Sequence, residues 1–500
     1  MKHILTACIL LLCLSSFGQL KLEGSLEFDS QGDVTVKSVY PLGKRGFLAL
    51  ALSNESEEQK YQLISFSANL QEETTVEFTM NKRTKNHGML VNQDSTEFSF
   101  LYASRSSWFV KTFSTERQEL TEKEFKKQNA SFVPLNFLVL KDKIIMNGLL
   151  HRRPRLLTLD IRTGQEELLE IPEIKAVGSI ESITLDENKE RAVIFFRRGK
   201  DQKTSAMNLV FLDENGVFSS PLTLEKDSEF SIIDGQVTWI NNESFLLAGT
   251  YGLGHLSKMA AGYYFSKWEN NVQQFITYHS FTEFRDFTKY LPTRQVKSIQ
   301  KKSKRSNASD YVENMVELHP VYLTDFGYRM IGEVYVPTYR YETRTYMSSN
   351  GRMSTRTVRV FDGFEYTHAA ILDLDEKGEK INDFCFILNL EIKPYKPIRN
   401  LRVYDDAAGD MKMVYAQNHS LVMNEIVGNE VETTEIGGIR ADMDVEGRST
   451  NFVRCVYWFG NTYMIYGVQT VLSDDESDHS RRAKKNRPTV FFVKKMSYND

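Results

Sequence analysis

Residues 156–172 read LLTLDIRTGQEELLEIP, two apolar runs separated by a turn that begins at Asp160 and contains Gly164. Aspartate at the start of such a turn accepts hydrogen bonds from the backbone that follows, and glycine supplies the positive φ that tight turns need. The stretch therefore predicts a β-hairpin. Turns of the same form recur as FDSQGD (28–33), LDENGV (212–217) and LDEKGE (374–379). None has the further oxygen ligands of a calcium loop, so we interpret all four as hairpin turns.

Apolar runs rich in β-branched or aromatic residues recur along the chain at a spacing of about fifty residues, with two longer intervals. They begin at Phe47, Phe98, Ile144, Ala192, Phe245, Tyr328, Met411 and Tyr463. Most are followed by a polar loop, a second run, a tight turn and a third strand. A unit of several short strands repeated every 40–50 residues or so has the period of a propeller blade.

In this period, and in the form of LLTLDIRTGQEELLEIP, the chain resembles the broad class of quinoprotein-like and WD40-like β-propellers, with no named family indicated. The resemblance implies an all-β fold of about eight four-stranded antiparallel blades. A seven-bladed propeller is the alternative count, because strands from the two chain ends often combine into one blade that closes the ring. Residues 19–500 would form a single propeller domain. Two stacked β-domains, split near residues 281–314, are the alternative.

The first residues, MKHILTACILLLCLSSFGQL, have a basic head, a short apolar stretch and small residues before Gln19. This pattern predicts a signal peptide over residues 1–18, and hence export to the periplasm or the extracellular space, with outer-membrane association left open. A lipoprotein interpretation would use Cys13, but Leu12 precedes it where a small side chain is expected. Two further cysteines, Cys385 and Cys455, lie in apolar runs and are predicted to be buried free thiols.

Two segments interrupt the repeat. Residues 281–314 begin with apolar residues at helical spacing, Phe281, Phe284, Phe287 and Leu291, and continue with six basic residues and no acid between positions 294 and 305. They predict a partly helical basic insertion, either a solvated linker or a contact with an anionic surface. Residues 473–488 form a charged loop. The net charge of -4 argues against nucleic acid as the main partner.

A third departure is the stretch VPTYRYETRTYMSSNGRMSTRTVRVFDGFEYTH at 336–368. Asn350-Gly351 is a strong signal for a two-residue hairpin turn, because both residues tolerate positive φ. We expect a long protruding hairpin over 337–363, an outgrowth of the sixth blade. Pro337 should lie opposite Phe364 and near Gly363, where a bulge would separate blade from ribbon.

A two-residue turn at this position would place Glu342 opposite Arg359, an opposite-charge pair that stabilises a ribbon. One face would then carry Tyr339, Tyr341, Val358 and Val360 with Arg356, and the other Arg340, Arg344, Tyr346, Arg359 and Phe361 with Glu342. Tyrosine and arginine dominate binding hot spots. The predicted partner-binding residues are therefore Tyr339, Arg340, Tyr341, Arg344, Tyr346, Arg356, Arg359 and Phe361.

No catalytic motif stands out, and no cofactor is expected. The segment DMDVEGRSTNFV (442–453) begins like a calcium loop, with Asp442, Asp444 and Glu446 as weak metal candidates, but Val453 occupies the place of the final glutamate. Eight histidines are scattered after the signal, at positions 87, 151, 255, 279, 319, 368, 419 and 479. Among them the best candidate for metal or acid–base chemistry is His151, which precedes two arginines in a hairpin loop.

The favoured interpretation is an exported, non-enzymatic binding or scaffold propeller that engages a protein partner in the cell envelope through the 338–361 ribbon and blade loops. The alternative is an extracellular hydrolase or lyase that acts on a polymer. That alternative predicts acid, histidine or tyrosine side chains converging within hydrogen-bond reach.

Overall fold

The structure is a computed structural model. It describes residues 20–30, 34–53, 58–81, 84–91, 96–172, 177–186, 190–198, 206–225, 229–253, 259–291, 293, 296–297, 314–347, 353–390, 393–395, 397–405, 411–417, 420–438, 448–460, 462–471 and 489–498. The signal peptide 1–18, the charged loop 473–488, the metal candidates Asp442, Asp444 and Glu446, and nearly all of 294–305 lie outside these residues.

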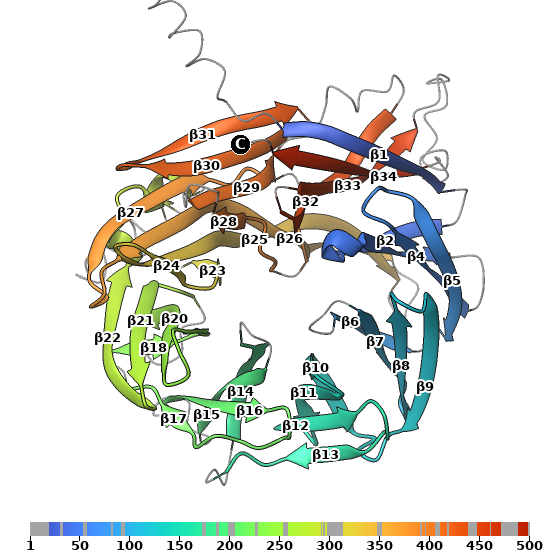
Figure 1. The fold of residues 1–500 in the computed structure, drawn as a ribbon, viewed down its shortest axis with the longest axis horizontal. Coiled ribbons are helices and arrows are strands. Elements are labelled where there is room, and N and C mark those ends of the chain that lie inside the picture. Colours follow the sequence, from blue (N-terminus) through green and yellow to red (C-terminus); the bar gives the residue numbers. More distant parts are fainter. Residues whose placement is uncertain are drawn as a thin grey trace, which may run out of the picture. The chain divides into compact units, whose positions relative to one another are not determined.

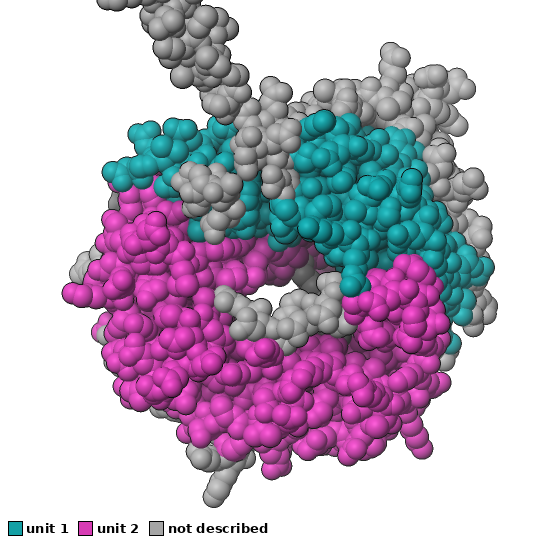
Figure 2. Space-filling view, viewed as in Figure 1, with its two compact units in different colours: residues 1–82, 390–392, 400–500 teal, residues 83–389, 393–399 magenta. Residues whose placement is uncertain are grey.

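The chain divides into two compact units, residues 1–82, 390–392 and 400–500 as unit 1 and residues 83–389 and 393–399 as unit 2 (Figure 2). The assignment of 19–500 to a single domain stays a prediction. Each unit consists of antiparallel sheets that follow one another along the chain (Figure 1).

Unit 1 contains three four-stranded sheets. They are β2 (Val34–Pro41), β3 (Phe47–Ser53), β4 (Glu58–Phe66) and β5 (Glu72–Asn81); β28 (Arg402–Asp405), β29 (Met411–Gln417), β30 (Ser420–Val427) and β31 (Glu430–Gly438); and β32 (Arg448–Phe459), β33 (Thr462–Val471), β34 (Thr489–Tyr498) and β1 (Leu20–Ser30). A 3-10 turn, η1 (Gly43–Arg45), precedes β3. In the third sheet the first strand of the chain is paired with the last, β1 with β34.

Unit 2 contains five sheets. The first three are β6 (Lys85–Val91), β7 (Glu97–Ala103), β8 (Ser107–Ser114) and β9 (Glu119–Lys126); β10 (Phe132–Leu140), β11 (Lys143–Leu150), β12 (Arg153–Asp160) and β13 (Glu166–Leu169); and β14 (Val177–Leu185), β15 (Arg191–Arg198), β16 (Met207–Asp213) and β17 (Leu222–Thr223).

In the last two sheets of unit 2, two short strands share the place of the first strand. One sheet has β18 (Phe230–Ile232) and β19 (Gln236–Trp239) beside β20 (Ser244–Leu253), then β21 (Gly262–Glu269) and β22 (Val272–Ser280). The other has β23 (Met315–Leu318) and β24 (Tyr322–Thr324) beside β25 (Gly327–Met347), then β26 (Met353–Leu374) and β27 (Lys380–Ile387).

These eight sheets are the blades of an all-β propeller, as the repeat predicts. The eight apolar runs lie in β3, β7, β11, β15, β20, β25, β29 and β33, the second strand of every blade. Such a strand has a hydrogen-bonded partner strand on each side, and within each unit neighbouring blades pack on its faces, which is why its sequence is a continuous apolar run. The outer strand β9, with sequence ELTEKEFK, is mostly exposed by contrast.

Neighbouring blades within each unit pack face to face through shared apolar clusters. Leu101 and Trp108 of one blade pack with Ile144 and Leu157 of the next in unit 2, and Phe47 of β3 packs with Trp458 of β32 in unit 1. Burying apolar surface of this kind contributes about 25 cal/mol per Å². Stacking therefore stabilises blades that could not cover both of their faces alone.

The hairpin turns are confirmed where they are described. Asp160 Oδ1 accepts hydrogen bonds from the backbone N–H groups of Arg162 and Thr163, at 2.8 and 2.7 Å, and Gly164 has a φ of +75°. The turns at Gly216 and Gly378 have the same form. Cys385 and Cys455 are free thiols, as predicted; Cys455 is buried, whereas Cys385 is only partly buried, against the prediction.

The helix predicted at the start of the 281–314 insertion is instead two 3-10 turns, η2 (Phe281–Glu283) and η3 (Phe287–Tyr290). The apolar residues at helical spacing, Phe281, Phe284, Phe287 and Leu291, are all buried in one cluster with β20, β21, β25 and β26. Their packing against the sheet, rather than a helical stripe, accounts for the spacing. No helix in the described part of the chain is long and apolar enough to cross a membrane.

Candidate functional site

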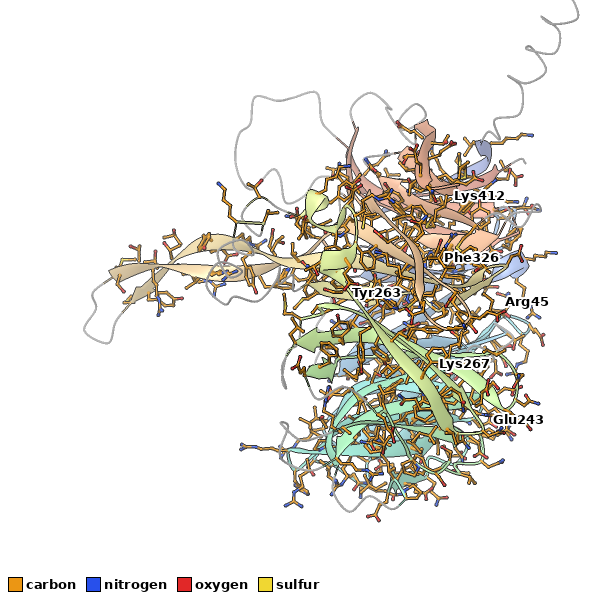
Figure 3. All side chains as sticks on the ribbon, turned by 90° about the vertical axis from the view of Figure 1, so that its left-hand side faces the viewer. Arg45, Glu243, Tyr263, Lys267, Phe326 and Lys412 are labelled. Carbon is orange, nitrogen blue, oxygen red and sulfur yellow. The ribbon has the colours of Figure 1, made fainter. Side chains whose placement is uncertain are left out.

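The longest strands in the described part of the chain, β25 and β26, form the predicted protruding hairpin. Their blade halves are buried, whereas residues 338–347 and 353–361, here called the arm, extend away from the blade (Figure 3). The predicted turn at Asn350-Gly351 lies outside the described residues. Tyr341 is 71% exposed, and Met347 and Met353, which pair at the last described position of the arm, are 73% and 74% exposed. The arm thus presents large side chains to solvent.

The predicted register of the arm is wrong by one residue. Met347 pairs with Met353, Tyr341 with Arg359 and Glu342 with Val358. A two-residue turn at Asn350-Gly351 would instead pair each of these β25 residues with the next residue along β26. Since side chains alternate between faces, a slip of one residue moves the whole β26 set to the other side. The proposed Glu342–Arg359 pair does not form.

The boundary between blade and arm is confirmed. Pro337 lies opposite Phe364, and the register shifts between Pro337 and Tyr339, with Gly363 at a φ of +97°. A Cβ atom on Gly363 would lie 2.3 Å from the carbonyl oxygen of Lys393. Only glycine fits this bulge, because it tolerates both the left-handed backbone and the close approach.

One side of the arm is here called the tyrosine face, comprising Tyr339, Tyr341, Arg359 and Phe361. The Arg359 guanidinium lies 3.5 Å from the centroid of the Tyr339 ring, and the Tyr339 and Phe361 rings are in edge contact at 5.9 Å. Cation–π contacts at exposed sites contribute about 0.5–1 kcal/mol. These contacts need the observed register and stabilise it against the predicted one.

The opposite side is here called the arginine face; its members are Arg340, Glu342, Arg344 and Tyr346 of β25 with Ser354, Arg356, Val358 and Val360 of β26. Glu342 is held between two guanidinium groups, with Oε1 2.9 Å from Arg340 and Oε2 3.0 Å from Arg344. Hydrogen bonds from Arg344 and Arg340 lower the pKa of the Glu342 carboxyl. Its partners are therefore neighbours on its own strand, two residues away on each side.

Residues 393–395 support the base of the arm. Phe364 N–H donates to the Pro394 carbonyl at 2.9 Å, Lys393 pairs with Glu365 at 3.1 Å, and the Tyr395 ring contacts Phe361. These contacts fix the point where the arm leaves the blade.

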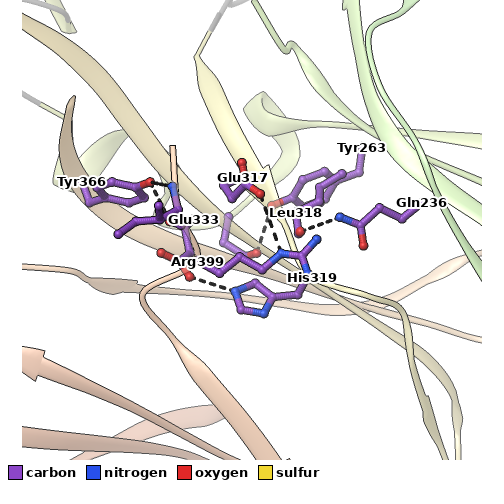
Figure 4. A network of polar contacts seen from close by, with 10 residues as sticks. Gln236, Tyr263, Glu317, Leu318, His319, Glu333, Tyr366 and Arg399 are labelled. Carbon is purple, nitrogen blue, oxygen red and sulfur yellow. Dashed lines mark hydrogen bonds and ion pairs between the residues drawn. The ribbon is translucent and has the colours of Figure 1, made fainter. Parts of the chain in front are cut away.

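A second polar site lies in the same blade, on the edge strand β23 and its neighbour β25 (Figure 4). His319 Nε2 is 2.8 Å from Glu333 Oε1, and both side chains are buried. Glu317 Oε1 lies 3.7 Å from Arg399 Nε. Gln236 of β19 joins the preceding blade to this site, since its side-chain amide donates to the Leu318 carbonyl at 2.8 Å.

Glu317 has the chemistry of an acid–base group near neutral pH. Burial raises its pKa to about 7, with Asp234 and Glu333 adding to the rise and Arg399 opposing it. Its side chain keeps 31% of its exposure. Sequence reasoning missed this site, although charged residues inside the apolar strands MVEL and GEVYV were a usable signal.

The described histidines do not converge. His151 sits in the β11–β12 turn with a φ of 52°, His279 is buried against the Gly378 carbonyl, and burial lowers the pKa of His368 to about 3. In the part of the chain that the structure describes, no group of three His, Cys, Asp or Glu side chains is arranged to hold a metal ion.

No protein-family model matches the chain, and no curated protein matches it. Among solved structures it is similar to the Dos1 propeller, at 10% identity and a TM-score of 0.38, over 81% of this chain and 78% of that one. It is also similar to the β-propeller domain of the Trilobed protease from Pyrococcus furiosus, at 8% identity and a TM-score of 0.35, over 82% and 99%. Polysaccharide lyase Uly1 matches at 8% identity and a TM-score of 0.37, over 95% and 99%. Likeness at this level concerns the fold and carries no argument about function.

Proposed function

We propose that the chain is a non-enzymatic binding or scaffold propeller, exported to the cell envelope, that engages a protein partner through the arm and the neighbouring blade loops. The observation that carries this proposal is the exposure of tyrosine and arginine side chains on both faces of the arm. Tyr and Arg are over-represented among the residues that dominate binding energy. An isolated two-stranded ribbon is only marginally stable in water, so a partner that covers it stabilises it.

The experiment compares the wild-type chain with a variant in which an Asn-Gly turn replaces residues 340–360. Tyr339 and Phe361 are directly opposed, so a two-residue turn closes the shortened hairpin without disturbing the blade. We expect the variant to keep the thermal midpoint of the wild type and to lose the partner in affinity purification from the native envelope. Retention of the same partner at wild-type yield would refute the proposal.

A second candidate function, an extracellular hydrolase or lyase acting on a polymer, is favoured by one observation: the Glu317 carboxyl with a pKa of about 7 beside Arg399. A general acid or base is most effective when its pKa lies near the working pH. The test is to incubate the protein with a panel of polysaccharides and to follow chain length. Cleavage abolished by Glu317→Gln but not by Glu376→Gln, a change at an exposed turn of the same blade, would support this candidate.

A further inference from the structure

The arginine face contains an arrangement that destabilises the free arm. Arg344 and Arg356 are directly opposed across β25 and β26. Like charges at directly opposed positions of an antiparallel pair are destabilising, and side chains at such positions have Cβ atoms about 4.5–5.5 Å apart. Both residues are exposed. The face therefore carries a repulsion that solvent and salt reduce but do not remove.

Positive charge is in excess on this face. It carries three arginines, Arg340, Arg344 and Arg356, against the single carboxylate of Glu342. Arg340 is also paired with Asp362 at the base, at 3.3 Å, so the excess lies toward the tip. Among the described residues, Arg356 has no ion pair. An anionic group placed between Arg344 and Arg356 would turn the repulsion into two attractions.

Glu342 shows which anion fits. Its two carboxylate oxygens each accept from a different guanidinium, Arg340 on one side and Arg344 on the other. An incoming carboxylate between Arg344 and Arg356 would likewise accept from two guanidinium groups, here across the two strands, while Arg344 keeps its hydrogen bonds to Glu342 through Nε and Nη2. The exposed Tyr346 side chain lies on the same face, and its hydroxyl is a further hydrogen-bond donor.

We propose that the distal arginine face, formed by Arg344, Arg356 and Tyr346, receives an acidic segment of the partner protein, with a carboxylate bridging the two guanidinium groups. This inference rests on the proposed function and names the partner's chemistry. Charge-assisted pairs between arginine and carboxylate are short and directional. The opposed arginines are thus a recognition feature that the free arm tolerates at some loss of stability.

The test measures binding of a fluorescein-labelled octaglutamate peptide by fluorescence anisotropy, at low and high salt. Arg356→Gln removes one charge from the arginine face. Arg105→Gln removes the same charge from an exposed turn between β7 and β8, in another blade, and is the matched control. We expect about fivefold weaker binding for Arg356→Gln and less than about twofold for Arg105→Gln, with wild-type affinity falling as salt rises.

Charge reversal separates recognition from folding. Arg356→Glu places a carboxylate opposite Arg344, so we expect a thermal midpoint at or above that of the wild type together with loss of peptide binding. A folded variant that still binds the peptide normally would overturn the inference.

Other outcomes also decide the question. Equal weakening by Arg356→Gln and Arg105→Gln, binding of anionic phospholipid vesicles in place of the peptide, or self-association that requires Arg356 would each overturn it. If the arm-shortened protein loses its partner while these two variants behave alike, the proposed function stands and only this inference fails. If the arm-shortened protein keeps its partner, the proposed function fails as well.

Discussion

The raised pKa of Glu317 makes a prediction about stability. In the folded chain this carboxyl keeps its proton up to a pH of about 7, against an ordinary value of 4.5. Between these two pH values the folded state therefore binds more protons than the unfolded state, and stability falls as pH rises. The loss is complete above a pH of about 7.

The size of the effect follows from the same two values. Each pH unit between 4.5 and about 7 corresponds to about 1.36 kcal/mol, which gives an upper limit of about 3.4 kcal/mol. Because the side chain keeps 31% of its exposure, solvent reduces this toward about 2 kcal/mol. Glutamine resembles the protonated carboxyl in shape and has no charge. The Glu317→Gln variant should therefore be more stable than the wild type by about 2–3 kcal/mol at pH 8 and equal to it near pH 4.5.

The assay is urea unfolding of both proteins across this pH range, followed by intrinsic fluorescence. Glu376→Gln is the control, since Glu376 is an exposed carboxylate on the β26–β27 turn of the same blade, and it should change stability by less than about 0.5 kcal/mol at every pH. A constant difference between Glu317→Gln and wild type from pH 4.5 to 8 would show that the carboxyl does not titrate in this way.

Three further predictions concern the blade and the arm. Arg329 and Asp373 form a buried, two-pronged ion pair at 2.6 and 2.8 Å. Asp373→Ala should lower the free energy of unfolding in urea by about 3–5 kcal/mol, because it removes the buried carboxylate that pairs with the Arg329 guanidinium, and Arg329→Met in the same chain should recover part of this loss. Gly363→Ala should lower the free energy of unfolding by about 1–3 kcal/mol. Gly428→Ala, at a turn where a Cβ meets open space, should lower it less. Equal effects in urea unfolding would contradict the bulge geometry. Cysteines at positions 341 and 359 should oxidise readily to a disulfide, and cysteines at 342 and 359 should not, as judged by non-reducing electrophoresis; the reverse result would restore the predicted register.

The propeller fold could be predicted from the sequence because the same pattern of strand and turn residues is repeated in every blade. Each blade repeats the same second strand, from Phe47 in β3 to Tyr463 in β33, and each described Asp–Gly turn forms as expected. An error in one repeat leaves the others intact. The boundary of the arm could also be predicted, because proline and glycine inside a sheet, here Pro337 and Gly363, usually mark an edge, a bend or a bulge.

The register of the arm could not be predicted reliably, because the prediction depended on a single turn motif and no second sequence feature supported or opposed it. The Asn350-Gly351 rule predicts one pairing, whereas the Arg359 contact with Tyr339 and the Tyr339 contact with Phe361 occur only in the other. The Glu317 site was missed for a different reason. Glu317 and Arg399 are far apart in the chain, and only the folded blade brings them together.

The pairing of β1 with β34 has a consequence for synthesis. Ser30 on the first strand is paired with Thr489 on the last, so β1 leaves the ribosome long before its partner exists. At about 5–20 residues per second, the delay is roughly 25–90 s. Throughout that time β1 is an open strand edge, able to pair with other chains. A chaperone that covers β1 until β34 has been made would therefore raise the yield of folded protein more than one that acts later.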